Sequence, residues 1–142
     1  MSTQENKRVM ETLFAALAEG DGAPLIEAMA EDFCWRLTGD TAWSGVYQGK
    51  DTVRKKLFGP LFAQFATRYT NTLTCLVAEG DYVVAECHGE VTTVTGEAYN
   101  NRYCWLCRFA DGQLKELTEY MDTELVSRVL VAPGGAARGD GC

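Results

Sequence analysis

The spacing of hydrophobic residues divides this chain into a helical first half and a strand-rich second half. Apolar residues recur every three or four positions over 6–18, which predicts an amphipathic helix. A shorter helix is predicted after Pro24, and a third over 50–65, where Gly59-Pro60 should break or kink it. Residues 33–37 have a strand-like composition, and the turn-rich segment that follows is predicted to be a loop or a short bent strand.

After residue 69 the hydrophobic period approaches two, which is typical of strands. Four consecutive strands are predicted, over 69–77, 82–94, 99–109 and 114–121. Asp122 occupies an N-cap position before a short terminal helix that ends near residue 130. Helices followed by a run of strands indicate an α+β fold. One domain over residues 1–131 is expected, followed by a disordered Gly-rich tail over 132–142.

Charge and hydropathy narrow the classes of partner. The formal net charge is −7, and the basic residues are scattered apart from Arg54-Lys55-Lys56, so no basic face for nucleic acid is expected. The N-terminus is polar, and no apolar run reaches the ~20 residues that span a bilayer. We therefore expect a cytoplasmic protein with no membrane segment.

Six cysteines raise the question of a metal or disulfide framework. Cys104 and Cys107 have CxxC spacing, but an odd separation in a strand directs their thiols to opposite faces. The chain has a single histidine and no second closely spaced thiol pair. We expect neither a metal nor a cofactor, and we interpret the strand cysteines as small buried hydrophobic residues.

Three short motifs occur in an order that resembles the NTF2-like superfamily. They are Ala18-Glu19-Gly20-Asp21, the segment Ser44-Gly45-Val46-Tyr47-Gln48-Gly49, and Arg108-Phe109-Ala110-Asp111-Gly112-Gln113-Leu114. The resemblance covers about residues 5–130 and is closer to the SnoaL-like and ketosteroid-isomerase-like branch. It implies a cone-shaped α+β barrel, in which a curved, mostly antiparallel sheet wraps around about three helices and encloses an apolar pocket. It also implies a homodimer formed through the outer face of the sheet.

The resemblance bears on the catalytic residues as well. The positions that match the ketosteroid isomerase residues are held by Leu13, approximately Arg36, and Trp105, none of which can perform that chemistry. In the polyketide-cyclase branch an acid/base carboxylate projects from the last strand, and the matching position here is Glu119. Apolar neighbours such as Met121 favour a raised pKa for that carboxyl group.

Strand register decides which side chains share a face. A symmetrical turn at Thr95–Ala98 would place His88 opposite Trp105, and would put Glu86, His88, Tyr103 and Trp105 on one face. At Asp111-Gly112, a tight two-residue turn would set Thr118 opposite Trp105, whereas a bulge would set Glu119 there. The motif match favours the bulge, which predicts a row of His88, Trp105 and Glu119.

Each candidate also has a structural interpretation. His88 is either a general base or a hydrogen-bonded sheet residue, and Glu86 either orients it or is a solvated strand residue. Glu119 is either acid/base or paired with Arg36 or Arg102. Arg36 either holds a substrate anion or neutralises a carboxylate.

Together these arguments predict a site and a function. The expected catalytic residues are Glu119, His88 and Glu86, and the expected substrate-binding residues are Tyr103, Trp105, Arg36, Tyr47, Trp43, Phe62 and Met121. The expected function is cofactor-free acid/base proton transfer on a small hydrophobic molecule, as in an isomerase, cyclase or hydrolase. The alternatives are a non-catalytic module that binds a small ligand or dimerises, and a transport or scaffold protein.

Overall fold

The computed structural model describes residues 2–133, so most of the predicted tail lies outside the described residues. Six strands form one sheet, ordered β2-β1-β6-β5-β4-β3. The strands are β1 (Met29–Leu37), β2 (Gly45–Gln48), β3 (Thr70–Glu79), β4 (Tyr82–Glu90), β5 (Arg102–Ala110) and β6 (Gln113–Met121). The helices are α1 (Thr3–Leu17), α2 (Ala23–Ala28), α3 (Lys50–Thr52), the π-helix η1 (Val53–Phe58), α4 (Gly59–Phe62) and α5 (Thr123–Val129).

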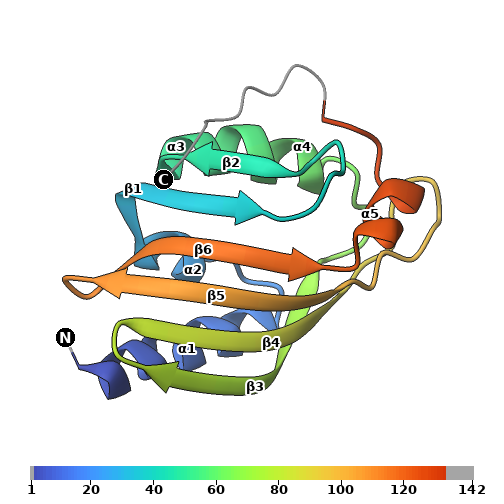
Figure 1. Ribbon diagram of the computed structural model, residues 1–142. Helices are drawn as coiled ribbons and strands as arrows, with labels where there is room; N and C mark the ends of the chain where they lie inside the picture. Colours follow the sequence, from blue (N-terminus) through green and yellow to red (C-terminus); the bar gives the residue numbers. More distant parts are fainter. Residues whose placement is uncertain (1, 134–142) are drawn as a thin grey trace.

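The sheet is curved and mostly antiparallel, which confirms the predicted α+β class. Only β1 and β6 run parallel, and they join the β1-β2 pair to the meander of β3 to β6. Figure 1 shows α1, α2 and the α3-η1-α4 helix behind one face of the sheet, and α5 at the end where β6 finishes. The inner face of the sheet and these helices therefore enclose the core.

Local capping explains where the first and last helices begin. The Ser2 hydroxyl accepts from the Glu5 backbone N–H at 3.1 Å, and the Glu5 carboxylate accepts from the Ser2 N–H at 3.2 Å. This capping box starts α1 three residues before the predicted position. Asp122 caps α5 as predicted, because its carboxylate accepts from the Glu124 and Leu125 N–H groups.

The third helix continues through Gly59-Pro60 instead of breaking there. The Gly59 N–H donates to the Arg54 carbonyl, five residues back, so Val53–Phe58 forms a π-helix. Pro60 then sits in the first turn of α4, a position where proline is tolerated. The widened turn accommodates the proline without ending the helix.

The register between β4 and β5 differs from the predicted one. Ala85, not His88, is opposite Trp105, and His88 is opposite Arg102. The connecting loop closes around Thr95, with the Thr93 N–H donating to the Glu97 carbonyl at 2.8 Å. The predicted pairing is thus wrong by three residues, and an odd shift sends every side chain of β4 to the opposite face.

The register between β5 and β6 is the predicted one, because Trp105 lies opposite Glu119. Asp111 and Gly112 both have positive φ, of 52° and 76°, and form a tight two-residue turn. The extra residue lies in the strand, at Lys115, between the pairs Phe109–Leu114 and Arg108–Glu116. A tight turn and a neighbouring bulge therefore occur together, although the sequence analysis treated them as alternatives.

The cysteines are divided between the two faces of the sheet. Cys104 is exposed and Cys107 is buried, as their odd spacing predicts. Cys87 is buried, but Cys75 is exposed, so the interpretation as buried hydrophobic residues is wrong for Cys75 and Cys104. Among the described residues no helix is long and apolar enough to cross a membrane.

Candidate functional site

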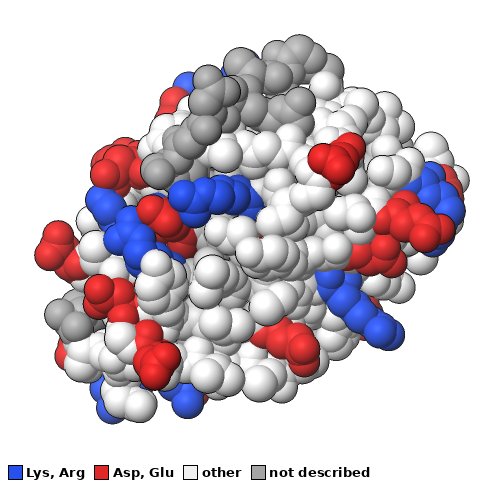
Figure 2. All heavy atoms as spheres, in the orientation of Figure 1, with Lys and Arg blue, Asp and Glu red and all other residues white. Residues whose placement is uncertain are grey.

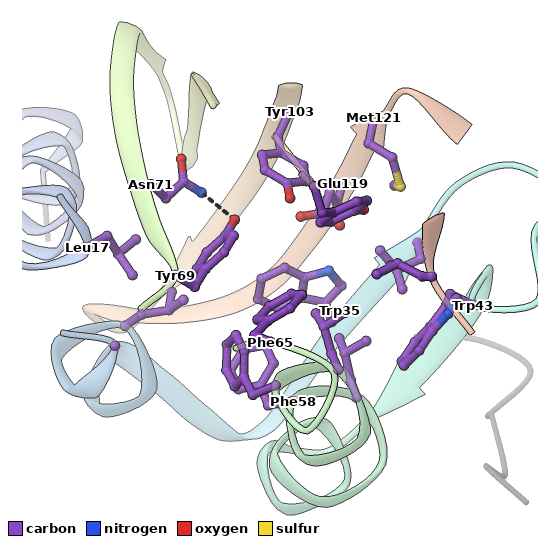
Figure 3. Close-up of a pocket in the computed structure, with 18 of the residues that line it drawn as sticks. Leu17, Trp35, Trp43, Phe58, Phe65, Tyr69, Asn71, Tyr103, Glu119 and Met121 are labelled. Atoms are coloured by element: carbon purple, nitrogen blue, oxygen red, sulfur yellow. Dashed lines mark hydrogen bonds between the residues drawn. The ribbon is translucent and has the colours of Figure 1, made fainter. Parts of the chain in front are cut away.

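A cavity of about 410 Å³ lies between the inner face of the sheet and the helices. Figure 3 shows side chains from β3, β5 and β6 on one side of it and the α3-η1-α4 helix on the other. Its wall is largely apolar and includes Leu17, Leu25, Trp35, Leu37, Trp43, Leu57, Phe58, Leu61, Phe62, Phe65, Met121, Val126 and Leu130. Such a wall suits a small hydrophobic compound.

Of the described residues, Glu119 is the one carboxylate in this wall. It projects from the inner face of β6 and is 8% exposed. The indole N–H of Trp105, opposite it on β5, donates to its Oε1 at 2.8 Å. Among the described residues, no cation forms an ion pair with it. Burial raises the pKa of Glu119 to about 7, whereas the hydrogen bond from Trp105 acts in the opposite direction.

Three tyrosines form the polar side of the cavity. Tyr69, Tyr99 and Tyr103 all line it, and Tyr99 Oη accepts from Asn101 Nδ2 at 3.0 Å. Figure 3 shows Tyr69, Tyr103 and Glu119 pointing into the same space. Burial raises the pKa of all three phenols, so each keeps its proton at neutral pH. The cavity thus holds neutral hydroxyl groups and one titratable carboxyl group.

Aromatic rings fix Trp105, and through it Glu119. Trp105 packs against Phe14 of α1 at 5.2 Å between ring centroids and against Trp35 of β1 at 5.5 Å, nearly perpendicular. These two ring contacts restrict the indole to one orientation. The N–H of Trp105 therefore points at Glu119 before any ligand arrives.

Gly89 on β4 provides the space that Tyr69 occupies. A Cβ atom at position 89 would lie 2.7 Å from Tyr69 Oη. We expect Gly89→Ala to displace the half-buried Tyr69 ring and to lower the free energy of unfolding by about 1–3 kcal/mol. Chemical denaturation measures this change. Gly22→Ala, which meets nothing within 4 Å, should cost less than about 1 kcal/mol; equal losses in both variants would contradict the expectation.

The structure does not bring His88 and Glu86 to the cavity. Because of the three-residue shift, both lie on the outer face of β4, where His88 Nε2 is 3.9 Å from Glu90 and Glu86 accepts from Thr74 at 3.3 Å. The predicted row of His88, Trp105 and Glu119 is therefore wrong. Only its Trp105–Glu119 part is present.

Arg36 and Tyr47 are also outside the cavity. Arg36 lies on the outer face of the sheet and forms an ion pair with Glu116 at 3.2 Å. It therefore neutralises a carboxylate, as one of its two predicted roles required, but that carboxylate is Glu116 and not Glu119. Tyr47 is fully buried in the core, and its hydroxyl donates to the Trp43 carbonyl at 2.8 Å. Neither side chain lines the cavity.

Six of the predicted site residues do line the cavity: Glu119, Tyr103, Trp105, Trp43, Phe62 and Met121. The sequence analysis missed Trp35, Tyr69 and Asn71. Trp35 is the middle residue of the alternating series Phe33, Trp35, Leu37, all buried, and this alternation was a usable signal. The spacing of Tyr69 and Asn71 was a second usable signal, because residues two apart in a strand lie on the same face.

The cavity has no metal site within the part of the chain that the structure describes. In residues 2–133 no three His, Cys, Asp or Glu side chains are grouped so that they could hold a metal ion. The polar groups in its wall include Glu119, the three phenols and the indole N–H groups.

Comparison with known families agrees with this architecture. The model of the SnoaL-like domain matches residues 10–117. The chain belongs to the SnoaL-like domain family. Among curated proteins, none matches this SnoaL-like domain.

Solved structures show the same fold. An NTF2-like protein of unknown function from Burkholderia pseudomallei superposes with a TM-score of 0.77 at 20% identity, covering 93% of this chain and 100% of the other. A putative SnoaL-like polyketide cyclase from Jannaschia sp. CCS1 gives 0.74 at 19% identity, covering 92% and 94%. TerC, co-crystallised with polyporic acid, gives 0.74 at 16% identity, covering 88% and 97%. The SnoaL-like domain therefore has the NTF2-like fold.

Proposed function

We propose that this SnoaL-like domain binds a small, uncharged, hydrophobic carbonyl compound in the cavity and transfers a proton on it without a cofactor. Glu119 is the acid/base. The observation that carries the proposal is this buried carboxyl group, which has an apolar environment, a single indole donor and a pKa of about 7. A group whose pKa lies near the working pH both accepts and returns a proton efficiently.

The rest of the cavity supports the same chemistry. An apolar, aromatic wall excludes water from the carbanion-like species that forms when a proton leaves carbon. Tyr69 and Tyr103 remain protonated and supply neutral hydroxyl groups near Glu119. Among the described residues, Arg68 is the one cation in the wall, and it is exposed. An uncharged substrate is therefore favoured.

The similar structures are consistent with a small organic ligand. TerC was crystallised with polyporic acid, and the Jannaschia protein is described as a putative polyketide cyclase. At identities below 20% these likenesses concern the fold. The assignment of acid/base chemistry to this chain therefore depends on Glu119.

Deuterium exchange tests this function without knowledge of the natural substrate. The probe is 2-acetylnaphthalene in D₂O, whose methyl protons exchange when a base removes them, and NMR follows their loss. The wild-type protein is expected to accelerate exchange above the buffer rate, and Glu119→Gln is expected to lose that acceleration. Binding of the probe without accelerated exchange would instead identify a non-catalytic ligand-binding module.

We also propose that the protein forms a homodimer through the outer face of the sheet. Val77, Tyr82 and Tyr120 are exposed on β3, β4 and β6. Figure 2, in the orientation of Figure 1, shows mainly uncharged atoms across the middle of this face. Exposed apolar area of this kind often marks an interface.

A charged residue on this face should weaken such a dimer. Tyr120→Glu is expected to raise the dimer dissociation constant at least tenfold, because the interface would then bury an unpaired carboxylate. Sedimentation equilibrium measures this constant. Gln4→Glu, on α1 behind the sheet, is the matched control and should leave the constant unchanged. A monomeric wild-type protein at high concentration would refute the proposal.

A further inference from the structure

Trp35 carries a buried hydrogen-bond donor that has no acceptor among the described residues. Its side chain lines the cavity, the residue is 4% exposed, and its Nε1 makes no hydrogen bond. The other two indole N–H groups are satisfied, that of Trp105 by Glu119 and that of Trp43 by the Val131 carbonyl at 3.1 Å. Leaving a buried donor unpaired is energetically unfavourable, so the position calls for an explanation.

Two other buried polar atoms also lack a hydrogen-bond partner, but they are weaker evidence for a ligand than Trp35 Nε1. Asn6 Oδ1 lies on α1 and does not line the cavity. Asn71 Oδ1 does belong to a cavity residue, whose Nδ2 donates to Tyr69 Oη at 3.4 Å. Of these three buried atoms, only Trp35 Nε1 is a hydrogen-bond donor.

Packing holds the Trp35 ring in one orientation. Phe33 contacts it at 6.1 Å between centroids, Phe58 at 5.4 Å and Trp105 at 5.5 Å, all nearly perpendicular. The ring cannot turn its N–H toward solvent without disrupting these contacts. The donor is therefore preorganised, which is the property that makes a hydrogen bond useful for stabilising a developing charge.

Trp35 is also close to the acid/base. Leu37, two residues further along the same face of β1, pairs with Glu119 of β6. Trp105 packs on Trp35 and donates to Glu119. Figure 3 shows Trp35, Tyr103 and Glu119 around the same part of the cavity. A bound molecule can therefore contact Trp35 and Glu119 together.

We infer that Trp35 binds the carbonyl oxygen of the substrate through its indole N–H while Glu119 removes a proton from the adjacent carbon. The C–H electron pair becomes the carbon–carbon double bond of an enolate, and the carbonyl π electrons move onto the oxygen held by Trp35. Glu119 then returns the proton to carbon, so the step needs no further reactant. The inference rests on the proposed function and specifies its substrate as an uncharged ketone or a similar carbonyl compound.

Equilibrium binding tests this role independently of turnover. Calorimetry measures the affinities of 2-acetylnaphthalene and of naphthalene, which lacks the carbonyl oxygen. The wild-type protein is expected to prefer the ketone, and Trp35→Phe is expected to reduce that preference about tenfold. An unchanged preference in the variant, or a wild-type affinity for the ketone no greater than for naphthalene, would overturn the inference.

A second variant separates the lost N–H from a lost shape. Replacing Trp35 with β-(3-benzothienyl)alanine keeps the size of the ring and substitutes sulfur for the N–H. It is expected to reproduce the reduced preference while leaving the naphthalene affinity within about twofold. If this variant retains the full preference for the ketone, the inference is wrong. Failure of wild-type exchange with intact ketone binding through Trp35 would refute the proposed function alone.

Discussion

Glu119→Gln is expected to lower the rate of deuterium exchange into 2-acetylnaphthalene by about 10²- to 10⁴-fold. This is the usual contribution of a positioned general base. The glutamine side chain has almost the same shape and retains an oxygen that can accept from Trp105 Nε1, as the carboxylate does at 2.8 Å. The loss therefore reports the missing proton acceptor and not a changed cavity. NMR of the probe in D₂O measures the rate.

Glu86→Gln is the matched control for this experiment. It makes the same chemical change on the outer face of β4, and it should leave the exchange rate unchanged. Equal losses in the two variants would contradict the role of Glu119.

The wild-type rate should also rise with pH through an inflection near 7, because only the ionised form of Glu119 accepts a proton.

Trp105→Phe should shift that inflection. The indole N–H stabilises the ionised form of Glu119 and thereby lowers its pKa. Without this donor the pKa of Glu119 should rise, and the inflection should move to higher pH. An inflection that stays in place would show that Trp105 does not tune the carboxyl group.

The second large effect concerns stability. Between pH 4.5 and about 7 the wild-type protein should lose about 3 kcal/mol of unfolding free energy relative to Glu119→Gln. The pKa of Glu119 rises from 4.5 to about 7 on folding because the carboxyl group is buried. The folded state therefore holds this proton more tightly than the unfolded chain. The stabilising contribution is complete below pH 4.5, declines as pH rises, and is lost above pH 7.

Urea denaturation at a series of pH values measures this difference. The other titratable groups that interact with Glu119 are Tyr69, Tyr99, Tyr103 and Cys87, whose raised pKa values keep them neutral over this range. Carboxylates with lowered pKa values, such as Glu116 and Asp32, contribute equally to both proteins. Parallel stability curves for the wild type and Glu119→Gln would show that Glu119 titrates normally.

The two assays divide the claims about Glu119. The stability curves depend only on burial, whereas the exchange rates depend on a substrate in the cavity. If the pKa of Glu119 is shifted but no exchange activity is found, Glu119 is a buried acid that does not act in catalysis. In that case the domain is a binding module whose cavity holds a carboxyl group for recognition.

Several features of this protein follow from local sequence. Hydrophobic periodicity predicts α1 and the later strands, because apolar side chains on one face must be buried whatever they pack against. Asp122 marks the start of α5, since its carboxylate satisfies two N–H groups that the helix leaves free. The Asp111-Gly112 dipeptide predicts the turn of the last hairpin. The motif match predicts that Glu119 lies opposite Trp105, and the structure has this pairing.

Other features depended on the tertiary structure. Alternation predicts that Glu86 and His88 share a face of β4, but the 91–101 connection decides which face, and it closes three residues from the symmetrical position. The raised pKa of Glu119 and the unpaired N–H of Trp35 depend on the groups that surround them. Sequence determined which residues lie together along each strand. Only the assembled sheet and helices determined which of them are removed from water, because desolvation is a property of all the packed neighbours.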